Sequence, residues 1–83
     1  MDLPRFETLA LELADHVALV ELNRPDKANA MSAAMWRELE ECFRWCDREP
    51  AVRAVVLAGR GRHFCAGIDL QMFATLDDPS LEP

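Results

Sequence analysis

The sequence predicts an α/β fold in which two strands, a helix, a third strand and a second helix follow one another. Three observations lead to this order. Two neighbouring segments alternate between apolar and polar residues, a long amphipathic stretch follows them, and a β-branched apolar run comes next. With 83 residues, 51% of them apolar and 29% charged, the chain has the composition of one globular domain with a small core.

The first two strands are expected on either side of a tight turn. Residues 8–14 read TLALELA and residues 17–22 read VALVEL, and only Asp15 and His16 separate them. Two alternating segments joined by two residues are typical of a β-hairpin.

A loop and an amphipathic helix follow the hairpin. Residues 23–30 (NRPDKANA) combine proline, asparagine and aspartate, which predicts a loop with a turn at the proline. Ser32 stands at an N-cap position, and apolar residues recur at helical spacing over residues 35–46. The spacing predicts a helix of about four turns that ends near Arg48, before Pro50.

The third strand is expected over residues 51–58 (AVRAVVLA), which are β-branched and nearly all apolar. This profile is typical of a strand buried on both faces of a parallel sheet, so we expect it at the sheet centre. A basic turn (residues 59–62, GRGR) follows, and a second helical pattern begins near Ile68. Residues 1–76 are predicted to form the domain, and residues 77–83, rich in Asp and Pro, a flexible tail.

Charge and composition exclude several classes of function. The net charge is -6 and the acidic residues are spread along the chain, which disfavours a nucleic-acid partner. The longest apolar run is interrupted by Arg53, and the N-terminus does not read as a secretory signal, so we expect no membrane span.

The three cysteines, Cys42, Cys46 and Cys65, are an odd number without the spacing of a disulfide framework. A reducing, cytoplasmic compartment is the simpler interpretation. A zinc site using them with His63 would lack any CxxC or HxxxH pair, so we predict no metal and interpret the cysteines as small buried hydrophobic residues.

Chemistry is expected where the second and third strands end, because ligands of open α/β sheets bind at the carboxyl ends of strands. In residues 65–70 (CAGIDL), small residues and a glycine precede a helical pattern. Such a turn can expose backbone N–H groups that stabilise a developing oxyanion. Taken alone, the run favours the plainer alternative, in which Gly67 is a turn glycine and Asp69 a first-turn acid facing the helix dipole.

Two blocks of sequence resemble the crotonase superfamily, the enoyl-CoA hydratase/isomerase family. Residues 17–31 (VALVELNRPDKANAM) are similar to the family's apolar strand, Leu-Asn-Arg-Pro and Asn-Ala-Leu or Asn-Ala-Met. Residues 55–70 (VVLAGRGRHFCAGIDL) are similar to its Gly-x-Gly-x-x-Phe-x-Ala-Gly-x-Asp block. Two blocks in family order are more specific than either alone, and the resemblance covers about residues 8–76.

The resemblance implies the β-β-α-β-α start of a crotonase-like (ClpP/crotonase) spiral fold, incomplete in this chain. The Ala-Gly-Ile-Asp-Leu variant leans towards dienoyl-CoA isomerase-like members. It also implies that the Ile68 backbone N–H is one donor of an oxyanion hole, which holds a thioester carbonyl as an enolate forms. The Ala66 carbonyl would accept from the adenine amino group of coenzyme A, which is part of the substrate, so no separate cofactor is expected.

The resemblance implies further substrate-binding residues around these two. They are Arg24 as a phosphate neighbour, Lys27, Ala28 and Ala30 along the nucleotide and pantetheine groove, and Gly67, Asp69 and Leu70 beside the acyl group, with Asp69 structural rather than catalytic. The family also implies a homo-oligomer, and Trp36 and Trp45 are interpreted as core or interface anchors.

The chain departs from the family in length, because a family monomer is roughly three times as long. The second oxyanion donor and the acid and base residues lie in the part without a counterpart here. Our leading hypothesis is therefore the N-terminal part of an acyl-CoA hydratase/isomerase, inactive alone. The alternatives are a non-enzymatic binding or assembly module that covers its sheet edge by dimerising, and a chain that itself turns over acyl-CoA. The acyl chain and the choice between hydration and isomerisation stay open.

Overall fold

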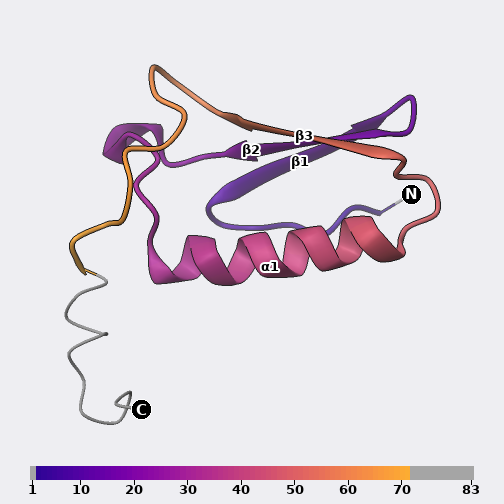
Figure 1. Cartoon of the computed structure of the whole chain (residues 1–83), viewed down its shortest axis with the longest axis horizontal. Coiled ribbons are helices and arrows are strands. Elements are labelled where there is room, and N and C mark those ends of the chain that lie inside the picture. Colours follow the sequence, from indigo (N-terminus) through magenta and orange to yellow (C-terminus); the bar gives the residue numbers. More distant parts are fainter. Residues whose placement is uncertain (1, 72–83) are drawn as a thin grey trace, which may run out of the picture.

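The computed structural model describes residues 2–71, which form a three-stranded sheet with a helix across one face (Figure 1). The elements, in chain order, are β1 (Leu9–Ala14), β2 (Val17–Leu22), the 3-10 turn η1 (Pro25–Lys27), α1 (Ala33–Arg48) and β3 (Ala54–Gly59). This is the predicted α/β class. The part of the expected second helix that lies beyond Gln71, and the expected tail, lie outside the described residues.

The predicted hairpin is confirmed. β1 and β2 pair antiparallel, from Leu9 opposite Leu22 to Ala14 opposite Val17. Asp15 and His16 connect them with φ values of 50° and 65°, the left-handed backbone that a two-residue hairpin turn with the right twist requires. The turn thus fixes which residues of each strand face the helix.

The predicted helix is confirmed at both ends. The Ser32 side chain accepts a hydrogen bond from the Met35 amide at 3.2 Å, which satisfies one of the free N–H groups of the first turn. At the other end the Glu49 amide donates to the Trp45 carbonyl at 3.0 Å, and the backbone then becomes extended. Helix α1 therefore spans the sheet from the loop side to the hairpin-turn side.

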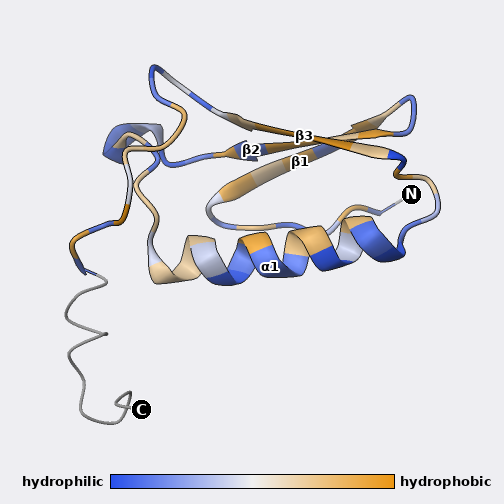
Figure 2. Cartoon of the chain, viewed as in Figure 1, coloured by the Kyte–Doolittle hydropathy of each residue, from blue (hydrophilic) through white to orange (hydrophobic). Residues whose placement is uncertain are grey.

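The core lies between α1 and the face of the sheet that it covers, and Figure 2 shows the apolar stripe of α1 turned towards the strands. Its buried apolar residues are Leu9, Ala18, Val20, Leu22, Met31, Met35, Cys42 and Cys46. Burial raises the pKa of the Cys42 thiol to about 12, so this cysteine is an inert core group, as the sequence predicted.

The prediction that the third strand is buried at the sheet centre is wrong. β3 pairs parallel with β2 only, so β2 is central and β3 is an edge strand. Val55, Val56 and Leu57 are 37%, 49% and 40% exposed. An apolar strand is buried only when other elements cover both its faces and both its edges. Among the described residues, β2 and α1 are the only helices or strands that adjoin β3.

Two features are absent from residues 2–71. No helix in this range is long and apolar enough to cross a bilayer. Nor does this range hold a cluster of three His, Cys, Asp or Glu side chains arranged to bind a metal ion.

Candidate functional site

Two loops meet at one end of the sheet. Because β2 and β3 are parallel, the first loop (residues 23–32) and the second loop (residues 60–70) leave the sheet at the same end. Figure 1 shows them side by side, the first as the violet turn around η1 and the second as the orange segment that passes it. The two stretches predicted to carry chemistry are therefore one site in space.

Backbone hydrogen bonds join the loops. Met31 and Ile68 form a parallel β-bridge. The Met31 amide donates to the Gly67 carbonyl at 2.7 Å, and the Asp69 amide donates to the Met31 carbonyl at 2.9 Å. The Ala66 amide donates to the Ala28 carbonyl at 3.0 Å. The second loop is thus held as an extended segment beside the first, and the helix predicted to begin near Ile68 has not started there.

The Ile68 amide of this segment is not paired with the first loop. The amides of Ala66 and Asp69 donate to the first loop, and the Gly67 amide lies 3.4 Å from the Cys65 sulfur. Within residues 2–71, the Ile68 amide has no such acceptor, and neither do the amides of Cys65 and Leu70 at the two ends of the segment. In the parallel bridge the Gly67 carbonyl and the Asp69 amide both pair with Met31, so the N–H of Ile68 between them points away from Met31.

Asn29 is the polar centre of the two loops, and its side chain is fully buried. Its Oδ1 atom accepts from the Arg24 amide at 2.7 Å, and its Nδ2 group donates to the carbonyls of Arg60 at 2.9 Å and His63 at 2.8 Å. Every polar group of the carboxamide is therefore satisfied. Asn29 was not predicted as a site residue; its only local signal is that asparagine tolerates the left-handed φ of 56° found here.

Arg24 lies in an ion pair with Asp69. Its Nη2 atom is 3.1 Å from Asp69 Oδ2, and its Nη1 atom donates to the Ala30 carbonyl. The two side chains are only 19% and 17% exposed. The other Asp69 oxygen accepts from the Gln71 amide at 3.0 Å, and this bond, followed by the Arg24 contact, holds the pKa of Asp69 below its usual range.

A pocket of about 280 Å³ opens where these groups meet. It is lined by Arg24, Lys27, Ala30, Ala66, Ile68, Asp69, Leu70 and Gln71. Of the predicted site residues, only Ala28 and Gly67 are missing from its wall. Each is next in the chain to a wall residue and has a positive φ, 51° and 109° respectively. Asp69 is the only carboxylate of the wall and is ion-paired, so the pocket offers binding groups and a backbone donor rather than an evident general base.

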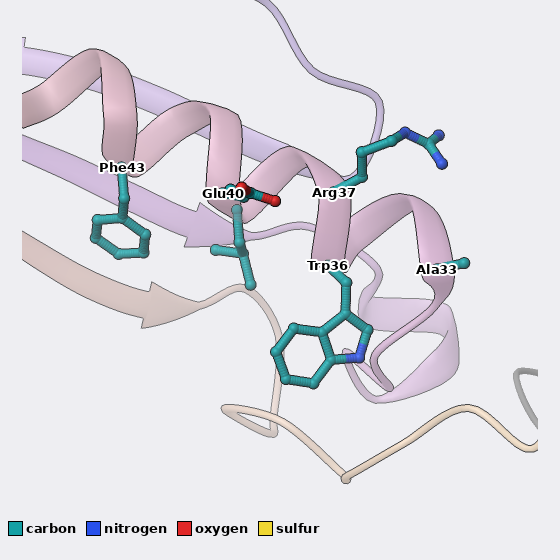
Figure 3. A pocket seen from close by; sticks show the side chains of 6 residues that line it. Ala33, Trp36, Arg37, Glu40 and Phe43 are labelled. Atoms are coloured by element: carbon teal, nitrogen blue, oxygen red, sulfur yellow. The ribbon is translucent and has the colours of Figure 1, made fainter. Parts of the chain in front are cut away.

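A larger hollow of about 710 Å³ runs along α1, away from this cluster of hydrogen bonds. Figure 3 shows the Trp36 and Phe43 rings projecting from the same side of the helix, with Arg37 and Glu40 nearby. Trp36 is 50% exposed, whereas Trp45 packs against the core. Of the two predicted anchors, only Trp45 is partly buried against the core within the described part of the chain.

The comparisons with known proteins point to one family. The family model described as enoyl-CoA hydratase/isomerase matches residues 12–80. A mitochondrial Delta(3,5)-Delta(2,4)-dienoyl-CoA isomerase of Mus musculus is 52% identical over 66 residues, 78% of this chain and 20% of that protein. A probable enoyl-CoA hydratase of Rhizobium meliloti is 42% identical over 72 residues, 87% of this chain and 28% of its own length.

Solved structures give the same result for the fold. An enoyl-CoA hydratase of Mycobacterium marinum superposes with a TM-score of 0.80 at 35% identity, covering 88% of this chain and 35% of that one. The chain therefore spans between a fifth and about a third of the length of these relatives. With a family match over most of its residues and the same fold in solved structures, the chain belongs to the enoyl-CoA hydratase/isomerase family, the crotonase superfamily.

Proposed function

We propose that the two loops form the coenzyme A thioester-binding half of an acyl-CoA hydratase/isomerase site. In this site the Ile68 amide donates to the thioester oxygen as an enolate forms. The observation that carries the proposal is the Ile68 N–H itself, which has no acceptor within residues 2–71 and belongs to a residue of the pocket wall. A fixed backbone donor needs no reorganisation as charge develops on the substrate oxygen.

The rest of the pocket fits the remainder of the ligand. The Ala66 amide is bonded to Ala28, which leaves the Ala66 carbonyl as the group proposed to accept from the adenine amino group. Lys27 and Ala30 line the other side of the groove, Ala28 lies between them in the chain, and the small alanine side chains leave room for a pantetheine arm. Gly67 and Leu70 flank the acyl end. No cofactor beyond the coenzyme A of the substrate is proposed.

The chemistry assigned to this part of the protein is binding and polarisation. One oxyanion donor contributes about 3–4 kcal/mol to transition-state stabilisation in enzymes where it has been removed. Proton transfer needs a positioned acid or base, and the one carboxylate of the pocket is bound by Arg24. We therefore propose that the acid and base belong to the larger part of the relatives' length that this chain does not span.

Titration of the 83-residue chain with a non-hydrolysable acyl-CoA analogue, followed by backbone amide NMR, tests the proposal. We expect the resonances of Gly67, Ile68 and residues 27–30 to shift together and to saturate, because they line one groove or directly adjoin the residues that line it. A dispersed spectrum in which none of these resonances moves would show a folded module without this ligand, and the assembly alternative would then lead.

A further inference from the structure

The first loop carries two cations at the pocket, Arg24 and Lys27. We infer that Arg24, through its pair with Asp69, is a positioning residue for the Ile68 amide and not a ligand of the coenzyme A phosphates. This inference rests on the proposed function and corrects the role that the resemblance implied for Arg24.

The Arg24 guanidinium is already bonded within the protein. The Asp69 carboxylate lies 3.1 Å from its guanidinium, and the Ala30 carbonyl occupies a second donor. A phosphate would have to compete with a carboxylate already in place, and the pair as a whole carries no net charge. Lys27, by contrast, is exposed at the pocket and forms no ion pair within residues 2–71, so it is the cation available to an anionic ligand there.

The guanidinium holds the two loops together at the Met31–Ile68 bridge. Ala30 immediately precedes Met31, and Asp69 immediately follows Ile68, so Arg24 bonds to both residues that flank the Met31–Ile68 bridge. One planar group therefore fixes the register of the two loops on both sides of the bridge. That register decides which side of the second loop the Ile68 N–H faces.

The backbone of Arg24 is itself held by hydrogen bonds. Its amide donates to Asn29 Oδ1 at 2.7 Å, and its carbonyl accepts from the amides of Lys27 and Asn29 at 2.9 and 2.8 Å. Asn29 in turn bonds to the second loop at Arg60 and His63. The guanidinium thus projects from a fixed base, as a residue that positions another group requires.

The experiment divides the ligand into two probes, each followed by amide NMR. The first is an acyl-pantetheine analogue with CH2 in place of sulfur, which keeps the carbonyl and lacks the nucleotide. The second is adenosine 3′,5′-bisphosphate, which keeps the phosphates and lacks the acyl arm. In the Arg24→Gln chain we expect affinity for the first probe to fall at least about threefold, with a smaller Ile68 shift, and affinity for the second to stay within about twofold. Lys27→Gln is expected to show the reverse.

Two variants sharpen the result. Arg24→Lys keeps the charge and loses the planar fork, so it should behave like Arg24→Gln if Arg24 positions the loop, and like wild type if it binds phosphate. Arg44→Gln removes one positive charge, as Arg24→Gln does, but at the exposed Arg44–Glu40 pair of α1, so it should leave both titrations unchanged.

The ligand-free chain gives an independent readout. In Arg24→Gln, hydrogen exchange at the Met31 and Asp69 amides should quicken while the hairpin amides keep their rates, because only the bridge has lost its clamp. If Arg24→Gln does not fold, Asp69→Asn, which keeps an acceptor and loses the charge, carries the same tests. Loss of nucleotide affinity in Arg24→Gln, or wild-type behaviour of Arg24→Lys with both probes, overturns the inference. If wild type binds neither probe, the proposed function fails, while the exchange rates still decide whether Arg24 clamps the bridge.

Discussion

At the scale of single residues, the site depends on polar groups and glycines that let two loops approach closely. A buried carboxamide without partners would cost about 1–3 kcal/mol, but Asn29 has partners for all its polar atoms and so joins the loops. Gly59 allows the same approach from the end of β3. A Cβ at this position would lie 2.5 Å from the Phe64 carbonyl oxygen and 2.8 Å from that of His63.

The Gly59→Ala substitution is expected to destabilise the chain by about 2 kcal/mol, since overpacking against atoms that cannot rotate away costs about 1–3 kcal/mol. The obstructing atoms are backbone, and moving the second loop away would also break the Asn29–His63 bond. Urea unfolding followed by circular dichroism measures the loss. Gly67→Ala is the matched control: nothing lies within 4 Å of its Cβ, so only the strain of a φ of 109° remains, about 1 kcal/mol. A larger loss for Gly67→Ala than for Gly59→Ala would contradict this explanation.

At the scale of the elements, α1 is tied to the start of β1 by one carboxylate. Glu38 accepts hydrogen bonds from the Glu7 amide at 2.9 Å, the Thr8 amide at 2.8 Å and the Thr8 hydroxyl at 2.6 Å. Burial alone would raise the pKa of Glu38, but these bonds and the nearby Arg37 charge outweigh it, so the pKa lies below its usual value. The helix is therefore held on the sheet by an interaction that needs an ionised carboxylate.

We expect Glu38→Gln to lower the free energy of unfolding by about 1.5–2 kcal/mol at pH 7, the lower part of the range for bonds to a charged group, because glutamine keeps one acceptor oxygen. Because the folded pKa is lowered, the stabilisation is fully present above the usual pKa of 4.5 and is lost as the pH falls through the lowered value. The difference between wild type and variant should accordingly shrink in acid. Urea unfolding at neutral and acidic pH checks this. Glu40→Gln, which affects only an exposed pair with Arg44, should change little, and an equal loss there would refute the assignment.

The sequence predicts an element well when the interactions that form it join residues close together in the chain. The hairpin and α1 rest on neighbours a few residues apart, namely the Asp15-His16 turn and the Ser32 cap, so their patterns were sufficient. The Asn29 bonds to Arg60 and His63 join residues more than thirty positions apart, and no local pattern reports them. The Arg24–Asp69 pair has no local signal for the same reason, since the two residues are 45 positions apart.

At the scale of the whole molecule, apolar surface is left uncovered where α1 and β3 adjoin. Val55 and Leu57 pair with Ala18 and Val20, so they share the face that α1 covers, yet both are exposed. Phe43 of α1 and Val55 line one hollow of about 360 Å³ between helix and strand. The sequence correctly reported that β3 is apolar enough to be covered. The pattern of β3 alone does not identify a covering element, because burial depends on residues distant in the sequence.

The open edge of β3 predicts that the 83-residue chain associates with itself as its concentration rises, since an exposed apolar edge strand is a template for another strand. Val56→Lys should reduce this association, because Val56 is 49% exposed and lies on the sheet face opposite the core, where a lysine adds charge without entering the packed interior. Val56→Thr keeps the β-branched shape without charge and should associate more than the lysine variant. Sedimentation velocity over a range of concentrations measures all three. Equal association of wild type and Val56→Lys would place the contact elsewhere, and a wild-type chain that stays monomeric at the highest concentration would remove the support that this edge gives to the assembly alternative.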